Sequence, residues 1–491
     1  MKTVLILSRG ARLSAVFGSL TRELSKKHRV VVVFGARRLI IADNPEDWAG
    51  IDNLTFYNLD SEIQARATGD LCQRASAIEK EIGLNLYRSA SNYLLYRRFA
   101  KDYFKYWPDF YETEHELLTE YVGSYSLMSD IFDRYRPDLV FCETPDLIAH
   151  RVAQAVAYRR GIFCLGTGFN NLFGDGIVNF TFGCNRRNPW FEYFYGHQDE
   201  LSAESWKAAD DLMARLAAGR LHDANYVDDH KQSIEGGSAV GNIMRVKRHL
   251  NASLSIAERF AQLRRLVASY FNKRWLNRHL QHSLPTQPYI LVSLHYQPEA
   301  STCMVAPTWV DQDYVVEQAA INAPCGIRIA VKENPKKFGL RGKAYYSRLA
   351  DLTNVELIHP LVSNDMLIRN AAAVLSIAGT VGMEAIALGK KTAILGRPSY
   401  DIYEEARKID HPADIFEHLA DPSWNPESSV ERRRRFLAAV AQSTFYIGPP
   451  QKATPWPRGE VAGPNYAHAL DKFLRFVERT NFHVGSVNAT L

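Results

Sequence analysis

The sequence has few cysteines and almost no excess of either charge. Its six cysteines are far apart, with no CxxC pair and no histidine at zinc-ligand spacing, which excludes a disulfide-stapled scaffold and a zinc finger. We therefore expect reduced thiols in a cytoplasmic protein. The net charge of +5, from 59 basic and 54 acidic residues, is too small over this length to predict a nucleic-acid partner.

Long hydrophobic runs are also missing. No stretch reaches the roughly 18 consecutive apolar residues that indicate a transmembrane helix. The first apolar run ends at Leu7, before Ser8, Arg9 and Gly10, so it predicts a strand and a loop rather than a signal peptide. Any membrane association is therefore expected to be peripheral, at the inner face of the cell membrane.

The chain has 491 residues, of which 46% are hydrophobic and 23% charged, and this predicts a folded protein of two or three domains. In each half, short apolar runs alternate with helical patterns, as is typical of parallel sheets with crossover helices. We predict an α/β protein with two Rossmann-like domains. The expected strands are Thr3 to Ser8, Arg29 to Gly35, Leu54 to Leu59, Asp138 to Glu143, Gly161 to Gly168, Tyr289 to Leu294, Ile327 to Lys332, Val355 to His359, Ala373 to Ile377 and Thr392 to Gly396.

The middle of the chain differs from both halves. Residues 185–284 show helical patterns only and predict a helical subdomain or insertion, which ends before Pro285 and Pro288. The expected division is an N-terminal Rossmann-like domain (1–184), the helical part (185–284), a C-terminal Rossmann-like domain (285–460), and a C-terminal helix and tail (461–491).

The strongest local motif is SIAGTVGMEAIALG, residues 376–389. Small residues around Gly379 allow close backbone approach, and a helix starting at Thr380 would point free N–H groups at a phosphate or carboxylate. Glu384, about one turn further, is placed to accept hydrogen bonds from ribose hydroxyls. The alternative is a tight strand-to-helix turn with a solvated glutamate.

Three further polar loops follow expected strands of the second half. The first is HYQPEAST, residues 295–302, in which His295 is either a ligand-binding or a structural histidine. The other two contain Lys332 and His359, which could neutralise a nucleotide phosphate from opposite sides, although either loop alone would be read as a surface turn. Because the carboxyl ends of parallel strands share one edge, four such loops together predict a binding site.

These motifs, together with the K-E-N-P loop, resemble the capsule polysaccharide biosynthesis family of bacterial glycosyltransferases, which includes the β-Kdo transferases that use CMP-Kdo. The resemblance covers roughly residues 289–403, and the N-terminal half is similar in architecture only. It implies a GT-B fold in which the C-terminal domain holds a nucleotide-sugar donor, the N-terminal domain holds the acceptor, and neither a metal nor a cofactor is needed.

The resemblance also implies roles for individual residues. It places Gln297 and Glu299 in the donor-side loop and Lys332 in the K-E-x-P loop, and it places Ser376, Thr380, Gly382 and Glu384 in the nucleotide turn. One position departs from the family, which commonly has K-E-H-P where this chain has Asn334, and the departure is consistent with a different donor.

Carboxylates for catalysis are expected in the N-terminal half. Glu143 ends an expected buried strand, with Asp146 close by, and a partly desolvated carboxyl there would have a raised pKa suited to proton exchange with the acceptor. The alternative for Glu143 is an N-cap or surface turn. In the β-Kdo transferases a glutamate and an aspartate are thought to share the work. The resemblance therefore makes Glu143 a candidate and leaves the aspartate open among Asp146, Asp175, Asp228 and Asp229.

Basic residues suggest two further contacts, each with an ordinary solvated surface as the alternative. Arg9 and Arg12 follow the first strand and are candidates for binding an anionic acceptor. The interleaved aromatic and basic residues of 92–107, and the run Arg432–Arg435, are candidates for contact with an anionic membrane.

The sequence thus predicts a cytoplasmic glycosyltransferase that moves a sugar, Kdo among the candidates, from a nucleotide donor to a surface or capsular polysaccharide or glycolipid. Three alternatives stay open: a UDP-sugar 2-epimerase, a CDP-polyol phosphotransferase, and a non-catalytic scaffold of polysaccharide assembly.

Overall fold

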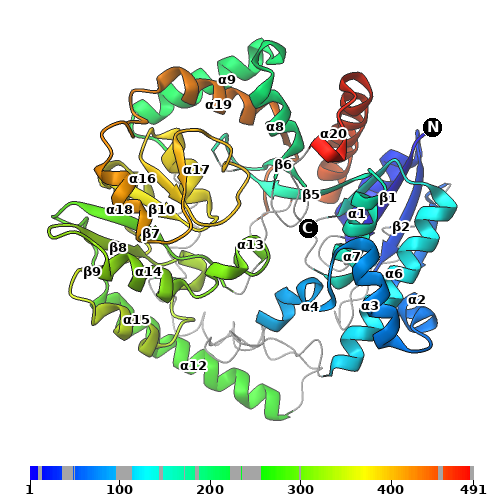
Figure 1. Ribbon diagram of the computed structural model, residues 1–491, viewed down its shortest axis with the longest axis horizontal. Coiled ribbons are helices and arrows are strands. Elements are labelled where there is room, and N and C mark those ends of the chain that lie inside the picture. Colours follow the sequence, from blue (N-terminus) through cyan, green and yellow to red (C-terminus); the bar gives the residue numbers. More distant parts are fainter. Residues whose placement is uncertain are drawn as a thin grey trace. The chain divides into compact units, whose positions relative to one another are not determined.

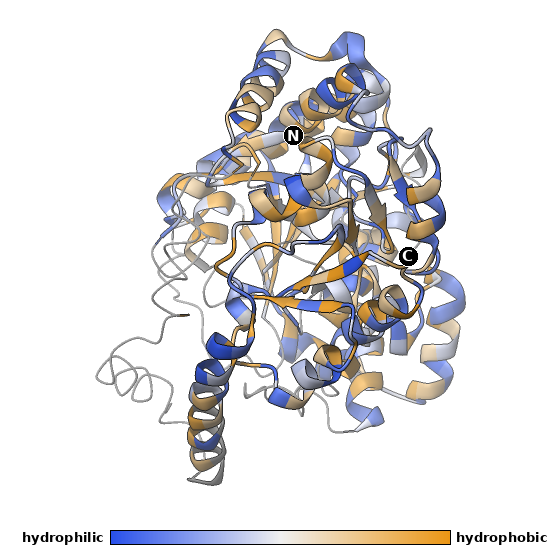
Figure 2. Ribbon diagram, turned by 90° about the vertical axis from the view of Figure 1, so that its left-hand side faces the viewer, coloured by the Kyte–Doolittle hydropathy of each residue, from blue (hydrophilic) through white to orange (hydrophobic). Residues whose placement is uncertain are grey.

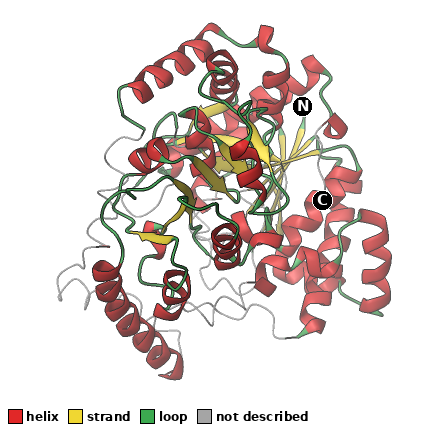
Figure 3. Ribbon diagram, turned by 60° about the vertical axis from the view of Figure 1, so that its left-hand side comes forward, coloured by secondary structure: helices red, strands yellow, loops and turns green. Residues whose placement is uncertain are grey.

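The computed structural model (Figure 1) describes residues 1–8, 14–35, 48, 50–52, 54–95, 113–142, 147–170, 172–182, 187–221, 234, 256–297, 300–451 and 457–486. The chain forms two compact units. Unit 1 comprises Met1–Tyr93, Asp109–Ala208 and Ala438–Leu491, and unit 2 comprises Leu94–Pro108 and Ala209–Leu437. Each unit contains one sheet flanked by helices (Figure 3).

Unit 1 contains a seven-stranded sheet of order β13-β6-β5-β4-β1-β2-β3. The strands from β3 to β5 are parallel, whereas β6 and β13 are antiparallel to their neighbours. The central strands have apolar, buried middles, as in Val4–Leu7, Val30–Val33 and Leu139–Cys142, which is expected when helices cover both faces. The strands are β1 (Thr3–Ser8), β2 (Arg29–Phe34), β3 (Leu54–Asn58), β4 (Leu139–Cys142), β5 (Phe163–Phe169), β6 (Ile177–Phe182) and β13 (Thr444–Tyr446).

The last α-helix of the described residues completes unit 1. Helix α20 (Gly459–Thr480) packs against α1 (Ser14–Ser25), and a Cβ on Gly463 would lie 2.4 Å from Ser19 Oγ, so only glycine permits this approach. Asp471 on α20 pairs with Lys27 at 3.1 Å. The other helices of this unit are α2 (Leu59–Arg66), α3 (Leu71–Ile82), α4 (Leu86–Ser89), α6 (Glu114–Tyr135), α7 (Ile148–Arg159), α8 (Pro189–Gly196), η4 (Gln198–Glu200) and η7 (Val484–Ser486).

Unit 2 contains a six-stranded, all-parallel sheet of order β12-β11-β10-β7-β8-β9. The chain runs outward from β7 to β8 and β9 and then returns to the other side of β7 as β10, so the strand order reverses between β7 and β10. Ligands of open α/β sheets bind at the carboxyl ends of the strands at such a reversal. The strands are β7 (Tyr289–Ser293), β8 (Arg328–Lys332), β9 (Val355–Ile358), β10 (Ala373–Ser376), β11 (Thr392–Ile394) and β12 (Ala406–Lys408).

The helices of unit 2 cover this sheet, and two helices continue from one unit into the other, α9 (Ala203–Ala217) and α19 (Val430–Gln442). Among the described helices of the chain, none is both long and apolar enough to cross a membrane. The remaining helices are α12 (Ile256–His279), α13 (Ala300–Cys303), η5 (Pro307–Trp309), α14 (Gln312–Ile321), η6 (Pro335–Lys337), α15 (Lys343–Ala350), α16 (Asn364–Asn370), α17 (Thr380–Ala387) and α18 (Asp414–Ala420).

The predicted fold class is confirmed: the chain is α/β, with two Rossmann-like sheets and helices in the described part of 187–284. All ten expected strands are present, with ends within two residues of the prediction. Strands β6, β12 and β13 were not expected. The predicted boundaries at 184, 284 and 460 stay predictions, and the observed units differ from them by placing Ala438–Leu491 in unit 1.

Candidate functional site

The loops that follow β7 and β10 meet at the strand-order reversal of unit 2. His295 comes two residues after β7 ends, and its buried ring lies against the first turn of α17. The backbone N–H of Ala378 points at His295 Nε2 at 3.5 Å, and a Cβ on Gly379 would lie 3.1 Å from the ring. The structure therefore brings the two strongest predicted motifs into contact, and a glycine at 379 leaves room for the histidine.

The backbone of His295 is held firmly from two sides. Its N–H donates to the Gln312 side chain at 2.6 Å, and its carbonyl accepts from Gln312 at 3.4 Å and from Arg341 at 2.6 Å. Gln297 is also buried, and its amide donates to the Val310 carbonyl at 2.6 Å and to Thr302 at 3.3 Å. The Gln297 amide nitrogen thus shapes this loop, and its predicted contact with a donor stays a prediction.

Lys332 ends β8 and is only 6% exposed. Its Nζ donates to the Val362 carbonyl at 2.6 Å and to the side-chain oxygen of Asn364. Among the described residues, no carboxylate lies within ion-pair distance of Nζ. Burial lowers the pKa of Lys332 to about 8, and the charge of Glu384 opposes this shift. A buried lysine and a buried glutamate from two different elements therefore share one electrostatic environment at this edge.

The next residue, Glu333, lies in a different environment. Its carboxylate forms an ion pair with Arg341 and accepts a hydrogen bond from Tyr346, and all three side chains are buried. Burial and the Glu333 charge raise the pKa of Tyr346 well above its ordinary value. Because Arg341 also donates to the carbonyl of His295, this ion pair connects the loop after β8 to the loop after β7. None of these three residues was a predicted site residue.

His359 lies at the end of β9 and is 1% exposed. Its Nδ1 accepts from Leu361 N–H at 3.3 Å, so its Nε2 carries the proton donated to Asn277 Oδ1 at 2.8 Å. Burial, together with His282 and Lys332, lowers the pKa of His359 to about 4. This lowering of the pKa favours the neutral imidazole at pH 7, and the predicted contact of His359 with a nucleotide phosphate stays a prediction.

The turn between β10 and α17 is fixed by a tyrosine that the sequence reasoning missed. Tyr400 donates its hydroxyl proton to the Gly379 carbonyl, and Ser376 Oγ donates to Tyr400 Oη at 3.0 Å. A Cβ on Gly382 would lie 2.4 Å from Tyr400 Oη. Helix α17 starts at Thr380, which is exposed, and its N-cap Gly379 has no side chain to occupy the first-turn N–H groups. These N–H groups remain suited to an anion.

Several predicted residues lie outside the described residues, namely Arg9, Arg12, Glu143, Asp146, Asp228, Asp229, Glu299 and the stretch 96–107. Asp175 is described and is exposed in the turn between β5 and β6. No group of acidic, histidine or cysteine side chains in the described part of the chain could hold a metal ion.

The arginines of the run Arg432–Arg435 in α19 form ion pairs and hydrogen bonds within unit 2. Arg432 pairs with Glu405, Arg434 with Asp210 at 2.6 Å, and Arg435 with Glu404 at 2.9 Å. Arg433 Nη1 donates to the Pro426 carbonyl at 3.4 Å. Each arginine of the run therefore has a partner within unit 2, and the predicted membrane contact of this run stays a prediction.

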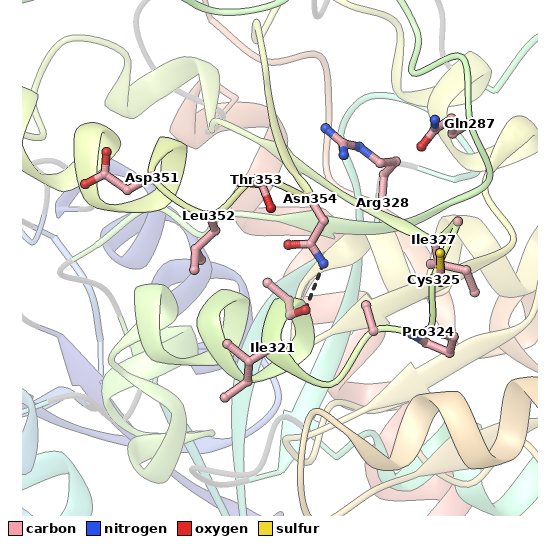
Figure 4. A pocket seen from close by; sticks show the side chains of 13 residues that line it. Gln287, Ile321, Pro324, Cys325, Ile327, Arg328, Asp351, Leu352, Thr353 and Asn354 are labelled. Carbon is pink, nitrogen blue, oxygen red and sulfur yellow. Dashed lines mark hydrogen bonds between the residues drawn. The ribbon is translucent and has the colours of Figure 1, made fainter.

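A depression of about 520 Å³ lies away from these loops, at the amino ends of β8 and β9 (Figure 4). Its polar groups support the fold: Asn354 donates to the Ala320 carbonyl at 2.8 Å, and Arg328 pairs with Glu356 at 2.9 Å. Ligands of such sheets bind at the opposite edge, so the candidate site is the cluster of loops described above.

Two Rossmann-like units, one with a glycine turn, a lysine and a glutamate at the carboxyl edge of its sheet, define a protein of the doubly wound α/β class. Residues 243–422 match the family described as "Capsule polysaccharide biosynthesis protein", and this range contains every described residue of the candidate site. The family resemblance recognised from residues 289–403 is therefore confirmed for this part of the chain.

Solved structures similar to this chain include a β-Kdo 2,4 transferase, KpsC of Thermosulfurimonas dismutans, with 14% identity over 65% of this chain and 84% of that chain, at a TM-score of 0.37. The S. aureus MnaA–UDP co-structure has 9% identity over 97% and 98% of the two chains, at a TM-score of 0.28. UDP-GlcNAc 2-epimerase from Neisseria meningitidis has 13% identity over 96% and 100%, at 0.27. The fold assignment rests on the strand order of this chain. No curated protein sequence matches it.

Proposed function

We propose that this protein is a glycosyltransferase of capsule or surface-polysaccharide synthesis, and that unit 2 binds its nucleotide-sugar donor. The observation that carries the proposal is the pair of buried charges, Lys332 and Glu384, beside the uncapped start of α17. A nucleotide sugar presents both kinds of group that this pair can recognise, a phosphate and the ribose hydroxyls.

In this proposal, Lys332 Nζ and the first N–H groups of α17 bind the donor phosphate. Nζ now donates to neutral oxygens only, so a phosphate would supply the negative charge that compensates its burial. Glu384 accepts hydrogen bonds from the ribose. His295, fixed between Gln312 and Arg341, limits the space beside Gly379 and so orients the ligand. The donor serves as substrate, and no separate cofactor is proposed.

The motif resemblance suggests Kdo, carried by CMP, as the transferred sugar, and an oligosaccharide or glycolipid as the acceptor. Unit 1 would hold that acceptor. Strands β1 and β4 are neighbours, with Leu7 opposite Cys142, and the chain continues from them into the segments with Arg9 and Arg12 and with Glu143 and Asp146. We propose that Glu143 exchanges the proton of the acceptor hydroxyl and that the arginines bind an anionic acceptor.

Donor binding is tested by calorimetry with CMP, CDP, UDP and GDP on the full chain. We expect one nucleotide to bind and to raise the Tm. Glu384→Gln should lose that binding and keep the fold, while the control Glu417→Ala, at an exposed position of α18, should behave as wild type. Unchanged affinity in Glu384→Gln would contradict the proposed role.

Transfer is tested with the nucleotide sugar in the presence and absence of an acceptor glycan. A transferase forms product only with the acceptor, and Glu143→Gln should then lose turnover while donor affinity stays. Product formed from the donor alone would contradict the proposal and indicate an epimerase instead. A protein that binds no nucleotide and transfers no sugar would be a scaffold.

A further inference from the structure

Helix α12 has one buried face and one face that is exposed to solvent. Its inner face is buried at Ser269, Asn272 and Leu276, and Leu276 packs with Phe338 and Tyr346 of unit 2. Its outer face exposes large apolar side chains at helical spacing, which is unusual for a surface helix because such residues normally lie on the inner face. The exposed residues are Phe260 (72%), Leu263 (39%), Val267 (48%), Tyr270 (48%) and Phe271 (63%).

The spacing of these five residues places them on one side of the helix. Leu263, Val267, Tyr270 and Phe271 follow Phe260 by three, seven, ten and eleven positions, which is the repeat of a single helical stripe. The stripe spans residues 260–271, half of α12, which extends as one long helix (Figures 1 and 2).

The same face is strongly basic. The helix contains six Arg or Lys residues and one acidic residue, Glu258. Arg264, Arg274 and Arg278 are exposed. Their spacing of four positions from Phe260 and of seven from Val267 and Phe271 puts them on the same side of the helix as the apolar stripe, with Arg264 beside it and the other two beyond its C-terminal end. An apolar stripe flanked by cations is typical of helices that lie in the interface of an anionic bilayer.

The positive charge of this face distinguishes between two candidate binding partners, a second copy of α12 and a lipid bilayer. A second copy of α12 would bring one basic face against another, and the like charges would repel each other. A bilayer containing anionic lipid offers apolar depth for the aromatic side chains and negative headgroups for the arginines, each worth about 1 kcal/mol near such a surface. We propose that the outer face of α12 binds an anionic lipid bilayer.

The inner face of α12 links this surface to the candidate site. Asn272 donates to the carbonyl of Gly339 at 3.2 Å and to that of Arg341, and Asn277 accepts from His359 at 2.8 Å. Docking through α12 would therefore hold the loops after β8 and β9 close to the membrane. The lipid contact itself rests on the exposed face of α12 and does not depend on the proposed transferase activity.

The test is sedimentation of the full chain with phosphatidylcholine vesicles, with and without phosphatidylglycerol. We expect binding only when phosphatidylglycerol is present, weakened by salt. The triple variant Phe260→Ser, Val267→Ser, Phe271→Ser should lose partitioning by about tenfold or more, and Arg264→Gln, Arg274→Gln, Arg278→Gln by a similar factor. The matched control is Ile321→Ser, an apolar side chain 65% exposed elsewhere on unit 2, which should bind vesicles as wild type does.

Each variant is first checked for an unchanged Tm and far-ultraviolet spectrum. The proposal is overturned if the wild type ignores phosphatidylglycerol vesicles, or if the apolar variant binds them fully. It is also overturned if the apolar variant only converts a dimer to a monomer in sedimentation equilibrium, since a second copy would then cover the face. Vesicle binding without nucleotide binding would contradict the proposed function and leave the lipid contact standing.

Discussion

Lys332 and Glu333 are consecutive, buried and oppositely charged, yet their side chains have different kinds of partner. Glu333 is fully paired, with an arginine and a tyrosine at its carboxylate. Lys332 donates to neutral oxygens, and the Glu384 charge only partly offsets its burial. A buried pair that satisfies itself is part of the framework, whereas a buried cation held by neutral groups is suited to an anionic ligand. We therefore assign Glu333 to the framework that supports the site and Lys332 to the groups that bind the ligand.

We expect the largest effect on stability from breaking the buried ion pair of Glu333 and Arg341. Arg341→Met leaves the Glu333 carboxylate buried without its cation and should lower the free energy of unfolding by about 3–5 kcal/mol. Denaturant unfolding measures the change. The control is Arg348→Met, whose exposed side chain pairs with Asp313 at 2.8 Å, and it should cost at most about 1 kcal/mol. Equal losses in both variants would remove the distinction between the two pairs.

On the binding side, Lys332→Met should keep or raise the Tm, because it removes a buried charge. It should weaken nucleotide binding by roughly tenfold to a hundredfold, since a hydrogen bond to a charged group contributes about 1.5–3 kcal/mol. Calorimetry measures the affinity, with Lys408→Met as an exposed control. A large drop in Tm with full nucleotide affinity would assign Lys332 to the framework instead.

The pH dependence of binding follows from the same lysine. Its pKa of about 8 in the folded protein means that Lys332 loses its charge as the pH rises through 8, and nucleotide affinity should fall there. Between about pH 8 and the unfolded value of 10.5 the unfolded chain binds more protons, so the contribution of Lys332 to stability rises with pH. Calorimetry near pH 8 in buffers of different ionisation enthalpy should show proton uptake on binding, and Lys332→Met should abolish it.

A smaller effect is expected at His359, whose pKa is lowered to about 4 from 6.5. Because the unfolded chain binds the proton more readily, the stability contributed by this histidine is lost as the pH falls from about 6.5 towards 4. Thermal unfolding across this range should show a shallower decline for His359→Gln than for wild type. The exposed control His468→Gln should follow the wild-type curve; a parallel curve for His359→Gln would show that this residue does not titrate with unfolding.

Most of the fold was predictable because buried parallel strands are apolar throughout, as in Val30–Val33 of β2. The missed strands are of another kind. Strand β13 has three residues and pairs antiparallel with β6. Thr444 lies opposite Asn179, which is 265 positions earlier in the chain. No local pattern can reveal a pairing over that separation.

The site divides in the same way. Loops after strands could be found from the sequence, so His295, Lys332 and Gly379 were found. Arg341 was not, because it lies between Lys337 and Lys343 in a basic segment, where its sequence resembles that of a solvated surface charge. Only the fold shows that its guanidinium reaches Glu333 and the His295 carbonyl. The neutral state of His359 was equally hidden, since it depends on burial and on His282, whose ring stacks on it at 4.2 Å.

The close packing of α20 on α1 also sets an order for synthesis. Residues from both ends of the chain build unit 1, with β13 at the edge of its sheet and Asp471 beside Lys27. A nascent chain emerging from the ribosome therefore has all of unit 2 available to fold while unit 1 still lacks its last strand and helix. Until Gly463 packs against Ser19, the surface of α1 that α20 later covers stays exposed to water or to chaperones.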